Sequence, residues 1–260
     1  MILGVLQARV SSSRLPGKVL KPILGRPMIL RQIERLRRAA TLDKLLVATS
    51  SDASDDPLAD LLAAEGIEFV RGPLDDVLAR FILAAEACDP EWIVRLTGDC
   101  PLADPAVIDR VVRETVAAAA DYGSNTITPT YPDGLDVEVV RAAVLRQIAA
   151  EPRSQAEREH VTLAVHRHPE RFRLHDVRND VDLSALRWTV DEPADLALVE
   201  RIYEALYAAN RAFATADVLR LLDERPDLVG VNAGFQRNEG LARSLANEAA
   251  ARAGSPRKES

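Results

Sequence analysis

Cysteine and aromatic residues are scarce in this chain of 260 residues. Cys88 and Cys100 are its only cysteines, so it has neither a disulfide framework nor a CxxC metal motif, and a reducing compartment suits it. No apolar run approaches the roughly 20 residues that span a bilayer. The apolar start, Met1–Arg9, lacks a basic n-region and a cleavage site, so it predicts a buried strand rather than a signal peptide. We therefore expect a soluble, cytoplasmic protein with an aliphatic core.

Positive charge is also in short supply. The chain has 33 Lys and Arg residues against 40 Asp and Glu, a net charge of −7 at pH 7. This balance argues against nucleic acid as a partner, because binding a phosphate backbone usually needs a basic face. The hydrophobic share of 47% and the charged share of 28% are those of a globular protein. The length suits one α/β domain with a sizeable core.

Apolar strands alternate with amphipathic helices in the first half of the chain. We expect strands at Ile2–Leu6, Lys44–Thr49, Ile67–Val70 and Trp92–Leu96. We expect helices at Met28–Leu36, Pro57–Ala64, Val77–Glu86 and Pro105–Ala120. This β-α order predicts a three-layer, Rossmann-like α/β fold, in which a mostly parallel sheet is covered on both faces. Ligands of such sheets bind at the carboxyl ends of the strands.

The pattern changes after Ala120. Residues 122–177 are expected to form a small α+β excursion, which builds either the acceptor site or a dimer interface. Its short strands are predicted at Tyr122–Thr128, Leu135–Val140 and Phe172–Val177, and its helices at Ala142–Ala149 and Glu157–His166. A core strand at Arg187–Val190 and helices at Pro193–Tyr207 and Thr215–Leu222 follow. The expected division is a single domain over 1–245 and a polar, frayed tail over 246–260.

The loop Gln7–Lys18 concentrates positive charge at the exit of the first strand. It carries Arg9, Arg14 and Lys18, the hydroxyls of Ser11–Ser13, and a glycine that allows close backbone approach. Polyphosphates are bound by such donors and fixed cations. A solvated basic loop is the alternative that composition leaves open. The loop is neither a GxxxxGK[ST] nor a GxGxxG motif, so P-loop and Rossmann dehydrogenase interpretations weaken.

Two aspartates end predicted strands. Asp99 follows Trp92–Leu96 beside a glycine, and Asp191 follows Arg187–Val190. Neighbouring strands would bring both carboxylates to one Mg²⁺ ion. The competing interpretation is structural, since acidic residues before helices are common N-terminal caps.

The loop Gln7–Lys18 and the turns Thr97–Leu102 and Val190–Leu196 together resemble the acylneuraminate and 3-deoxy-manno-octulosonate cytidylyltransferases, and more closely their SpsF branch, named for spore coat polysaccharide biosynthesis. Further matching segments are Arg71-Gly72, Asp75–Phe81, Tyr131–Glu138, Arg158–Thr162, Asn232 and Arg237–Gly240. The resemblance covers roughly residues 1–245. It implies the nucleotide-diphospho-sugar transferase fold, a homodimer, and Mg²⁺-dependent transfer of CMP from CTP to an acidic or amino sugar with release of pyrophosphate, for surface polysaccharide biosynthesis.

The resemblance also implies roles for individual residues. The nucleotide-binding set is Ala8, Arg9, Ser13, Arg14, Lys18 and Arg71, in which Arg71 lies near the cytosine ring. Arg14, Lys18 and Asp99 are the expected catalytic residues, and Asp99 and Asp191 are the expected Mg²⁺ ligands. Gln7 and Cys100 depart from the octulosonate enzymes, which puts that sugar in doubt more than the nucleotide chemistry.

Polar residues of the excursion are expected to line the acceptor-sugar site. They are Tyr131, Asp133, Glu138, Arg158, Glu159 and His160. The structural alternative is that Arg158 and Glu159 only solvate a helix and that His160 is a satisfied structural histidine. Two other functions stay open: a glycosyltransferase that uses a nucleotide-sugar donor, and a non-catalytic nucleotide-binding subunit. The cationic first loop and the carboxylate pair favour nucleotidyl transfer over both.

Overall fold

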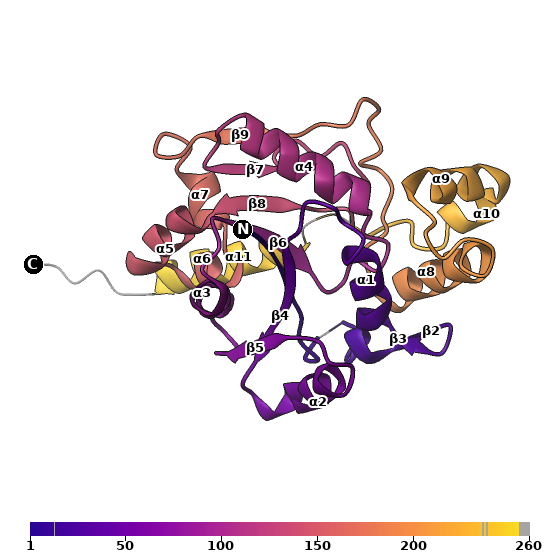
Figure 1. The fold of residues 1–260 in the computed structure, drawn as a ribbon, viewed down its shortest axis with the longest axis horizontal. Coiled ribbons are helices and arrows are strands. Elements are labelled where there is room, and N and C mark those ends of the chain that lie inside the picture. Colours follow the sequence, from indigo (N-terminus) through magenta and orange to yellow (C-terminus); the bar gives the residue numbers. More distant parts are fainter. Residues whose placement is uncertain (13, 236, 238, 255–260) are drawn as a thin grey trace, which may run out of the picture.

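A seven-stranded sheet forms the centre of the computed structural model, which describes residues 1–12, 14–235, 237 and 239–254 (Figure 1). The strand order is β5-β4-β1-β6-β8-β7-β9. The strands are β1 (Ile2–Gln7), β4 (Lys44–Ser50), β5 (Phe69–Gly72), β6 (Trp92–Thr97), β7 (Tyr122–Ser124), β8 (Glu138–Arg141) and β9 (Leu174–Asp176). The predicted Rossmann-like α/β fold is confirmed.

Strands β5, β4, β1 and β6 run parallel, as their apolar sequences predict. Strand β8 is antiparallel to both β6 and β7, whereas β7 and β9 are parallel. The excursion thus extends the main sheet instead of forming a separate layer.

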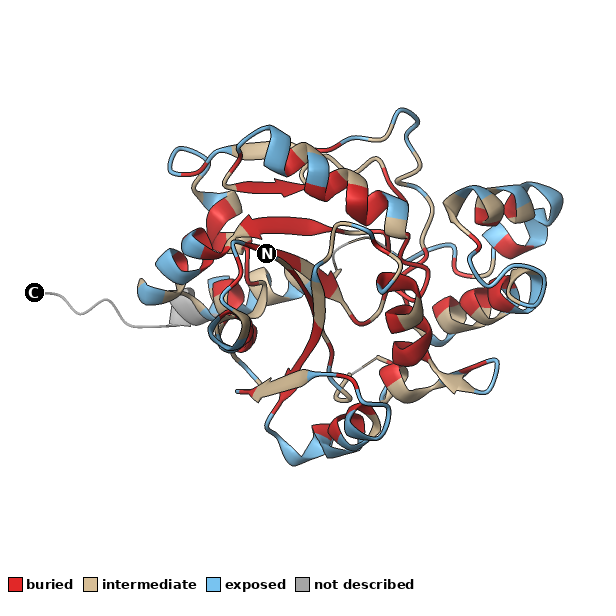
Figure 2. Ribbon diagram, in the orientation of Figure 1, coloured by how far each residue is buried: buried red, intermediate tan, exposed pale blue. Residues whose placement is uncertain are grey.

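Helices cover both faces of the sheet, and alternate residues of each strand point to opposite faces. Leu6 and Val94 pack in the core under α1 (Met28–Leu36), α2 (Asp56–Ala64), α4 (Pro105–Ala117) and α8 (Pro193–Leu206). Val5 and Ile93 pack in a second core, under α3 (Val77–Cys88) and α5 (Ala142–Ala150). The central strands are therefore buried on both sides (Figure 2).

Two predicted elements differ in the structure. The helix expected at Glu157–His166 is split into α6 (Gln155–Glu159) and α7 (Leu163–Arg167), because Val161 takes a left-handed backbone conformation with φ 45°. The segment Arg187–Val190 is not a strand: Trp188 N donates to Asp133 O at 2.6 Å and Val190 N to Asp99 O at 2.8 Å. It crosses the carboxyl end of the sheet instead of pairing along it.

The C-terminal region is more helical than expected. It contains α9 (Thr215–Glu224), α10 (Pro226–Val229) and α11 (Glu239–Gly254). The predicted frayed tail begins at residue 246, but α11 continues to Gly254, which corrects that boundary. Alanine-rich sequence has high helix propensity, and Glu248 of this helix pairs with Arg167. Residues 255–260 lie outside the described residues.

The carboxyl ends of β1 and β6 meet where the first loop begins. Gln7 and Thr97 are the last paired residues of the two strands. At Gly98 a Cβ atom would lie 2.9 Å from Ala8 Cβ and 3.0 Å from Gln7 O, so only glycine allows this approach. The remaining short elements are η1 (Lys18–Leu20), η2 (Ala53–Asp55), and β2 (Pro22–Ile23) and β3 (Arg26–Pro27), which form a separate two-stranded sheet. No described helix has the length and apolar character needed to cross a membrane.

Candidate active site

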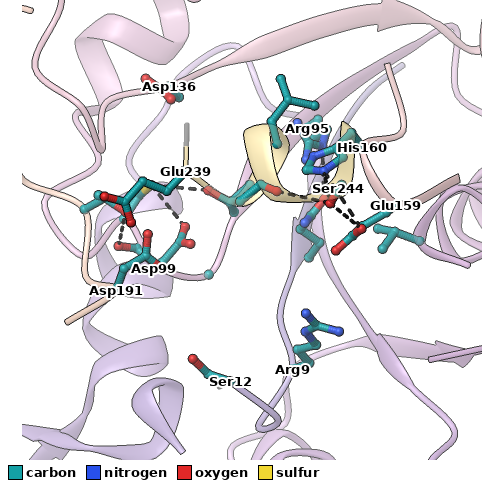
Figure 3. A pocket seen from close by; sticks show the side chains of 18 of the residues that line it. Arg9, Ser12, Arg95, Asp99, Asp136, Glu159, His160, Asp191, Glu239 and Ser244 are labelled. Carbon is teal, nitrogen blue, oxygen red and sulfur yellow. Dashed lines mark hydrogen bonds and ion pairs between the residues drawn. The ribbon is translucent and has the colours of Figure 1, made fainter. Parts of the chain in front are cut away.

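A cavity of about 590 Å³ opens at the carboxyl ends of the central strands. The first loop and the turn after β6 form one side of it, and segments of the excursion form another. Helix α11 reaches two groups of lining residues (Figure 3): its Glu239 lies near Asp99 and Asp191, and its Ser244 lies near Arg95, Glu159 and His160. The cavity is therefore bordered by parts of the chain that are far apart in sequence.

Lys18 lies at the centre of the acidic group. Its Nζ atom is 3.2 Å from Asp99 Oδ2, 2.8 Å from Asp191 Oδ1 and 2.9 Å from the carbonyl oxygen of Val190. Gly17, in the left-handed region with φ 69°, turns the chain into the short helix that carries Lys18. The predicted convergence of the first loop with two distant aspartates is thus present.

Charge pairing dominates the electrostatics of this group. Burial acts to lower the pKa of Lys18, but Asp99 and Asp191 outweigh it and the pKa is raised. Burial likewise acts to raise the pKa of Asp99, but Lys18 outweighs it and holds this pKa at about 2. The Lys18 ammonium and the Asp99 carboxylate are therefore charged at neutral pH.

Arg14 also pairs with Asp191, one of these two carboxylates. Its Nη2 atom is 2.8 Å from Asp191 Oδ2, and its Nη1 atom is 2.7 Å from Glu239 Oε2 at the start of α11. Glu192 lies 3.5 Å from its Nε atom. Arg14 thus joins the first loop to both the Asp191 turn and the C-terminal helix.

The neighbouring wall carries further carboxylates. Asp133 pairs with Arg187, and Asp136 pairs with Arg237. Burial, together with the negative charges of Asp133, Glu138 and Asp99, raises the pKa of Asp136 to about 7, although Arg237 opposes the rise. Asp136 therefore titrates near neutral pH.

A buried polar network lies beneath the excursion side of the cavity. Glu138 is bonded to Arg95 and to the hydroxyl of Thr162, and it accepts a hydrogen bond from Tyr122 at 2.9 Å. His166 Nε2 lies 2.5 Å from the Tyr122 hydroxyl. Burial acts to raise the pKa of Glu138, but Arg95 outweighs it and the pKa is lowered. These bonds fix one wall of the cavity.

Helix α11 is attached to the excursion by hydrogen bonds. Ser244 Oγ donates to Glu159 Oε2 at 2.8 Å and lies 3.1 Å from His160 Nε2. The pKa of His160 is lowered, chiefly by burial and then by the charge of Arg95. His160 is therefore part of the contact between α11 and α6.

Most of the predicted site residues lie together. Those that line the cavity are Ala8, Arg9, Arg14, Lys18, Asp99, Asp133, Glu138, Glu159, His160 and Asp191. Ser13 lies outside the described residues. Their roles as ligand-binding residues stay predictions.

Three predicted residues do not line the cavity. Arg71 bonds Ser50 O at 2.8 Å and pairs with Asp56 at 2.6 Å, so its guanidinium is turned away from the site. Arg158 pairs with Asp76 at 2.5 Å. Tyr131 is buried in the hydrophobic core. The sequence predicts which segments approach the cavity, but it does not give the direction in which each side chain points.

Several lining residues are not among those predicted from the sequence. They are Arg80, Arg95, Asp136, His166, Arg187 and the α11 residues Glu239, Arg243, Ser244 and Asn247. Asp136 and Arg80 lie within the segments Tyr131–Glu138 and Asp75–Phe81 that carried the family resemblance, which was the available signal. Glu239, the first residue of α11, lies within the matching segment Arg237–Gly240, but nothing in the local pattern places the rest of α11 over the site.

The carboxylate pair fits a divalent ion. The described residues contain no group of three or more His, Cys, Asp or Glu side chains arranged to hold a metal. Asp99 and Asp191, however, both reach one cationic nitrogen, so their oxygens already flank one cation position. Mg²⁺ in nucleotide enzymes is often held by one or two carboxylates plus substrate phosphates.

Comparisons with known proteins identify the family. A family model described as cytidylyltransferase matches residues 3–210. The spore coat polysaccharide biosynthesis protein SpsF of Bacillus subtilis (strain 168) is 33% identical over 234 residues, which are 87% of this chain and 95% of that protein. The mitochondrial 3-deoxy-manno-octulosonate cytidylyltransferase of Arabidopsis thaliana is 34% identical over 148 residues, 55% of this chain and 50% of that protein.

A solved structure supports the same relationship. A cytidylyltransferase from Leptospira borgpetersenii serovar Hardjo-bovis (strain JB197) superposes with a TM-score of 0.84 at 26% identity and covers 91% of this chain and 99% of its own. The resemblance inferred from the motifs is therefore confirmed. The chain therefore belongs to the cytidylyltransferase family.

Proposed function

We propose that this enzyme transfers CMP from CTP to an acidic or amino sugar and releases pyrophosphate. The observation that carries the proposal is the convergence of Arg14 and Lys18 with Asp99 and Asp191 at one end of the cavity. A triphosphate needs fixed cations, and its transfer chemistry needs carboxylates that hold Mg²⁺. The names of the SpsF and octulosonate relatives support a sugar acceptor and a role in surface polysaccharide biosynthesis.

The reaction is a displacement at the α-phosphorus. An acceptor hydroxyl oxygen forms a bond to this phosphorus and gives up its proton, while the bond to the bridging oxygen of the β-phosphate breaks. Phosphoryl transfer asks the protein mainly for alignment and charge neutralisation. Arg14 and Lys18 would neutralise the leaving pyrophosphate.

Asp99 and Asp191 are the proposed Mg²⁺ ligands. The ion would supply Lewis-acid polarisation of the phosphate when it is bound. Because Lys18 Nζ now lies between the two carboxylates, this side chain would turn toward the phosphates as the nucleotide binds.

The acceptor sugar is placed on the excursion side of the cavity. Asp133, Glu138 and His160 line that side, and Asp136 joins them. These groups can donate to or accept from several hydroxyls, as sugar recognition requires.

The direct test is a binding and turnover experiment. Purified protein is mixed with CTP, ATP, UTP or UDP-sugars, with and without Mg²⁺, and its thermal unfolding is followed, because a ligand of the native state raises the unfolding temperature. We expect a shift with CTP and Mg²⁺ and a smaller one with the other nucleotides. Pyrophosphate release is then measured with CTP across a panel of acidic and amino sugars.

The remaining outcomes separate the alternatives. A shift with UDP-sugars but not with CTP would favour a glycosyltransferase. Binding of CTP with no pyrophosphate release from any sugar in the panel would favour a non-catalytic nucleotide-binding subunit.

A further inference from the structure

The proposed displacement releases a proton from the acceptor hydroxyl, and a group of the cavity has to receive it. Arg14 and Lys18 are cations and cannot take it up. Asp99 and Asp191 both pair with Lys18 and are the proposed metal ligands. The recipient therefore has to be another side chain of the cavity.

Asp136 is held in the cavity wall by its neighbours. Leu135 and Val137 on either side of it are buried in the hydrophobic core, whereas Asp136 lines the cavity. Asn125 fixes this segment, because its Nδ2 atom donates to Leu135 O at 2.8 Å and its Oδ1 atom accepts from Val137 N at 2.8 Å. The carboxylate of Asp136 thus starts from a rigid backbone.

Only one oxygen of Asp136 is bonded to a residue that the structure describes. Arg237 Nη2 pairs with Oδ1, and Arg237 Nη1 donates to Tyr131 O at 3.0 Å, which holds the guanidinium in place. Oδ2 accepts no hydrogen bond from the described part of the chain. It therefore has lone pairs available for a substrate hydroxyl.

The charges around Asp136 favour uptake of a proton. Burial raises its pKa, Arg237 opposes the rise, and the negative charges of Asp133, Glu138 and Asp99 add to it, so the pKa is about 7. A base is most effective when its pKa lies near the working pH, because it is then both ionised and able to hold a proton.

The other groups on the acceptor side are less suited to this role. Glu138 is bonded to three side chains, and its pKa is lowered. Burial lowers the pKa of His160 and of His166, which makes both weaker bases. The side chain of Asp133 is only 12% exposed, against 27% for Asp136, so Asp136 is more accessible to a substrate.

Asp136 also lies near the phosphate-binding end of the cavity. In Figure 3 it is on the same side as Asp99 and Asp191, whereas His160 is on the other side. The charge of Asp99 acts on its pKa, and Glu138, two residues further on, belongs to the acceptor side. A sugar hydroxyl that approaches the α-phosphorus from the acceptor side would therefore pass beside Asp136.

We propose that Asp136 is the general base of the reaction and that Arg237 positions it. Asp136 Oδ2 takes the proton of the sugar hydroxyl while the hydroxyl oxygen bonds to the α-phosphorus. The bond from this phosphorus to the bridging oxygen breaks, and its electron pair leaves with pyrophosphate. Arg237 holds Oδ1 and so keeps Oδ2 directed at the hydroxyl. This inference rests on the proposed function.

The test is the pH dependence of pyrophosphate release in a single turnover, with the full chain in excess over CTP and with Mg²⁺ and the accepted sugar saturating. The wild-type rate should rise with pH and level off above about pH 7, because only the ionised carboxylate accepts a proton. Asp136→Asn should be slower by about 10²–10⁴-fold and should lose this rise. Its affinity for CTP, measured by calorimetric titration, should stay that of the wild type.

Asp133→Asn is the matched variant, because it removes the neighbouring carboxylate of the same wall. It should raise the KM for the sugar and keep the rise in rate near pH 7. A rise that came from the phosphates of CTP or from a histidine would be retained in Asp136→Asn, so the two variants separate these sources. Added formate should restore part of the rate of Asp136→Ala, since it supplies the missing carboxylate.

The outcomes separate this inference from the function on which it rests. An Asp136→Asn enzyme that is slow but keeps the rise near pH 7 would overturn the role of Asp136, as would a wild-type rate in this variant. Loss of CTP affinity in Asp136→Asn would assign Asp136 to nucleotide binding and overturn it too, as would loss of the rise in Asp133→Asn alone. A wild-type protein that releases no pyrophosphate with any sugar would overturn the proposed function itself.

Discussion

Lys18 is the residue on which the charge balance of the site depends. It neutralises Asp99 and Asp191 at once, and its side chain is only 12% exposed. We expect Lys18→Ala to lower the rate of pyrophosphate release by about 10²–10³-fold, because a preorganised charge contact to the leaving group is lost. The rate is measured with CTP, Mg²⁺ and the accepted sugar.

Lys21→Ala is the matched control for that experiment. Lys21 lies three positions further along and does not line the cavity, so its loss should leave the rate unchanged. A Lys18→Ala enzyme with near-wild-type turnover would contradict the assignment. Asp99→Asn should lower the rate by a similar factor of about 10²–10³, because a proposed Mg²⁺ ligand loses its charge.

Asp136 should make stability depend on pH. Its folded-state pKa is about 7, above the ordinary 3.8, so the unfolded chain ionises first and the native state loses stability as pH rises from about 4 to 7. The side chain of Asp136→Asn cannot ionise. The free energy of unfolding of this variant should therefore rise relative to that of the wild type over this pH range, by roughly 2–4 kcal/mol at pH 8. The measurement is chemical unfolding at pH 4.5 and pH 8.

Exposed Asp60 of α2 provides the control for the pH experiment. Asp60→Asn removes a carboxylate from the exposed surface and reports any general effect of this substitution on unfolding. If the difference between Asp136→Asn and wild type were the same at pH 4.5 and pH 8, the raised pKa of Asp136 would be contradicted.

At the scale of elements, the sequence predicts the parallel half of the sheet well. Strand Ile2–Gln7 is buried on both faces and is apolar up to Leu6, and Trp92–Thr97 is apolar except at Arg95 and Thr97. The excursion is harder to predict because its strands are short: β7 and β9 have three residues each. Arg187–Val190 has the apolar pattern of a strand but bonds Asp133 and Asp99 across the sheet end, a long-range constraint that no local pattern contains.

Some residues of the candidate site could likewise be predicted from the sequence, and others could not. Lys18, Asp99 and Asp191 follow or precede recognisable elements, so their convergence could be predicted. Arg71 and Arg80 could not be told apart, because only the packing of α3 against β5 decides which guanidinium reaches the cavity.

Helix α11 should oppose nucleotide binding through its first residue. Glu239 Oε2 lies 2.7 Å from Arg14 Nη1, so a triphosphate that binds Arg14 has to displace a carboxylate. Glu239→Ala should tighten CTP binding by about 3- to 10-fold, a modest change because the pair is partly exposed. Calorimetric titration measures it.

Glu248→Ala serves as the control, since this residue of α11 pairs with Arg167 away from the first loop. Its CTP affinity should match the wild type. Weaker binding in Glu239→Ala would instead show that Glu239 contributes to holding the nucleotide.

At the scale of the whole molecule, the cavity is lined by residues both inside and outside the part of the chain that the family model matches. The cytidylyltransferase match ends at residue 210, yet α11 borders the cavity.

The resemblance implies a homodimer, and β9 leaves an edge of the sheet open to pairing. Light scattering should give twice the chain mass of 28.4 kDa; a mass of one chain would contradict the dimer.

The position of Lys18 has a thermodynamic consequence for the order of ligand arrival. The Lys18 ammonium already bridges the two carboxylates, so it competes with a divalent cation for the same oxygens. Mg²⁺ alone should therefore bind weakly there. A nucleotide offers that ammonium new anionic partners and thereby releases the oxygens. The ion and the nucleotide should consequently strengthen each other's affinity by one common factor, as linkage demands of two coupled ligands.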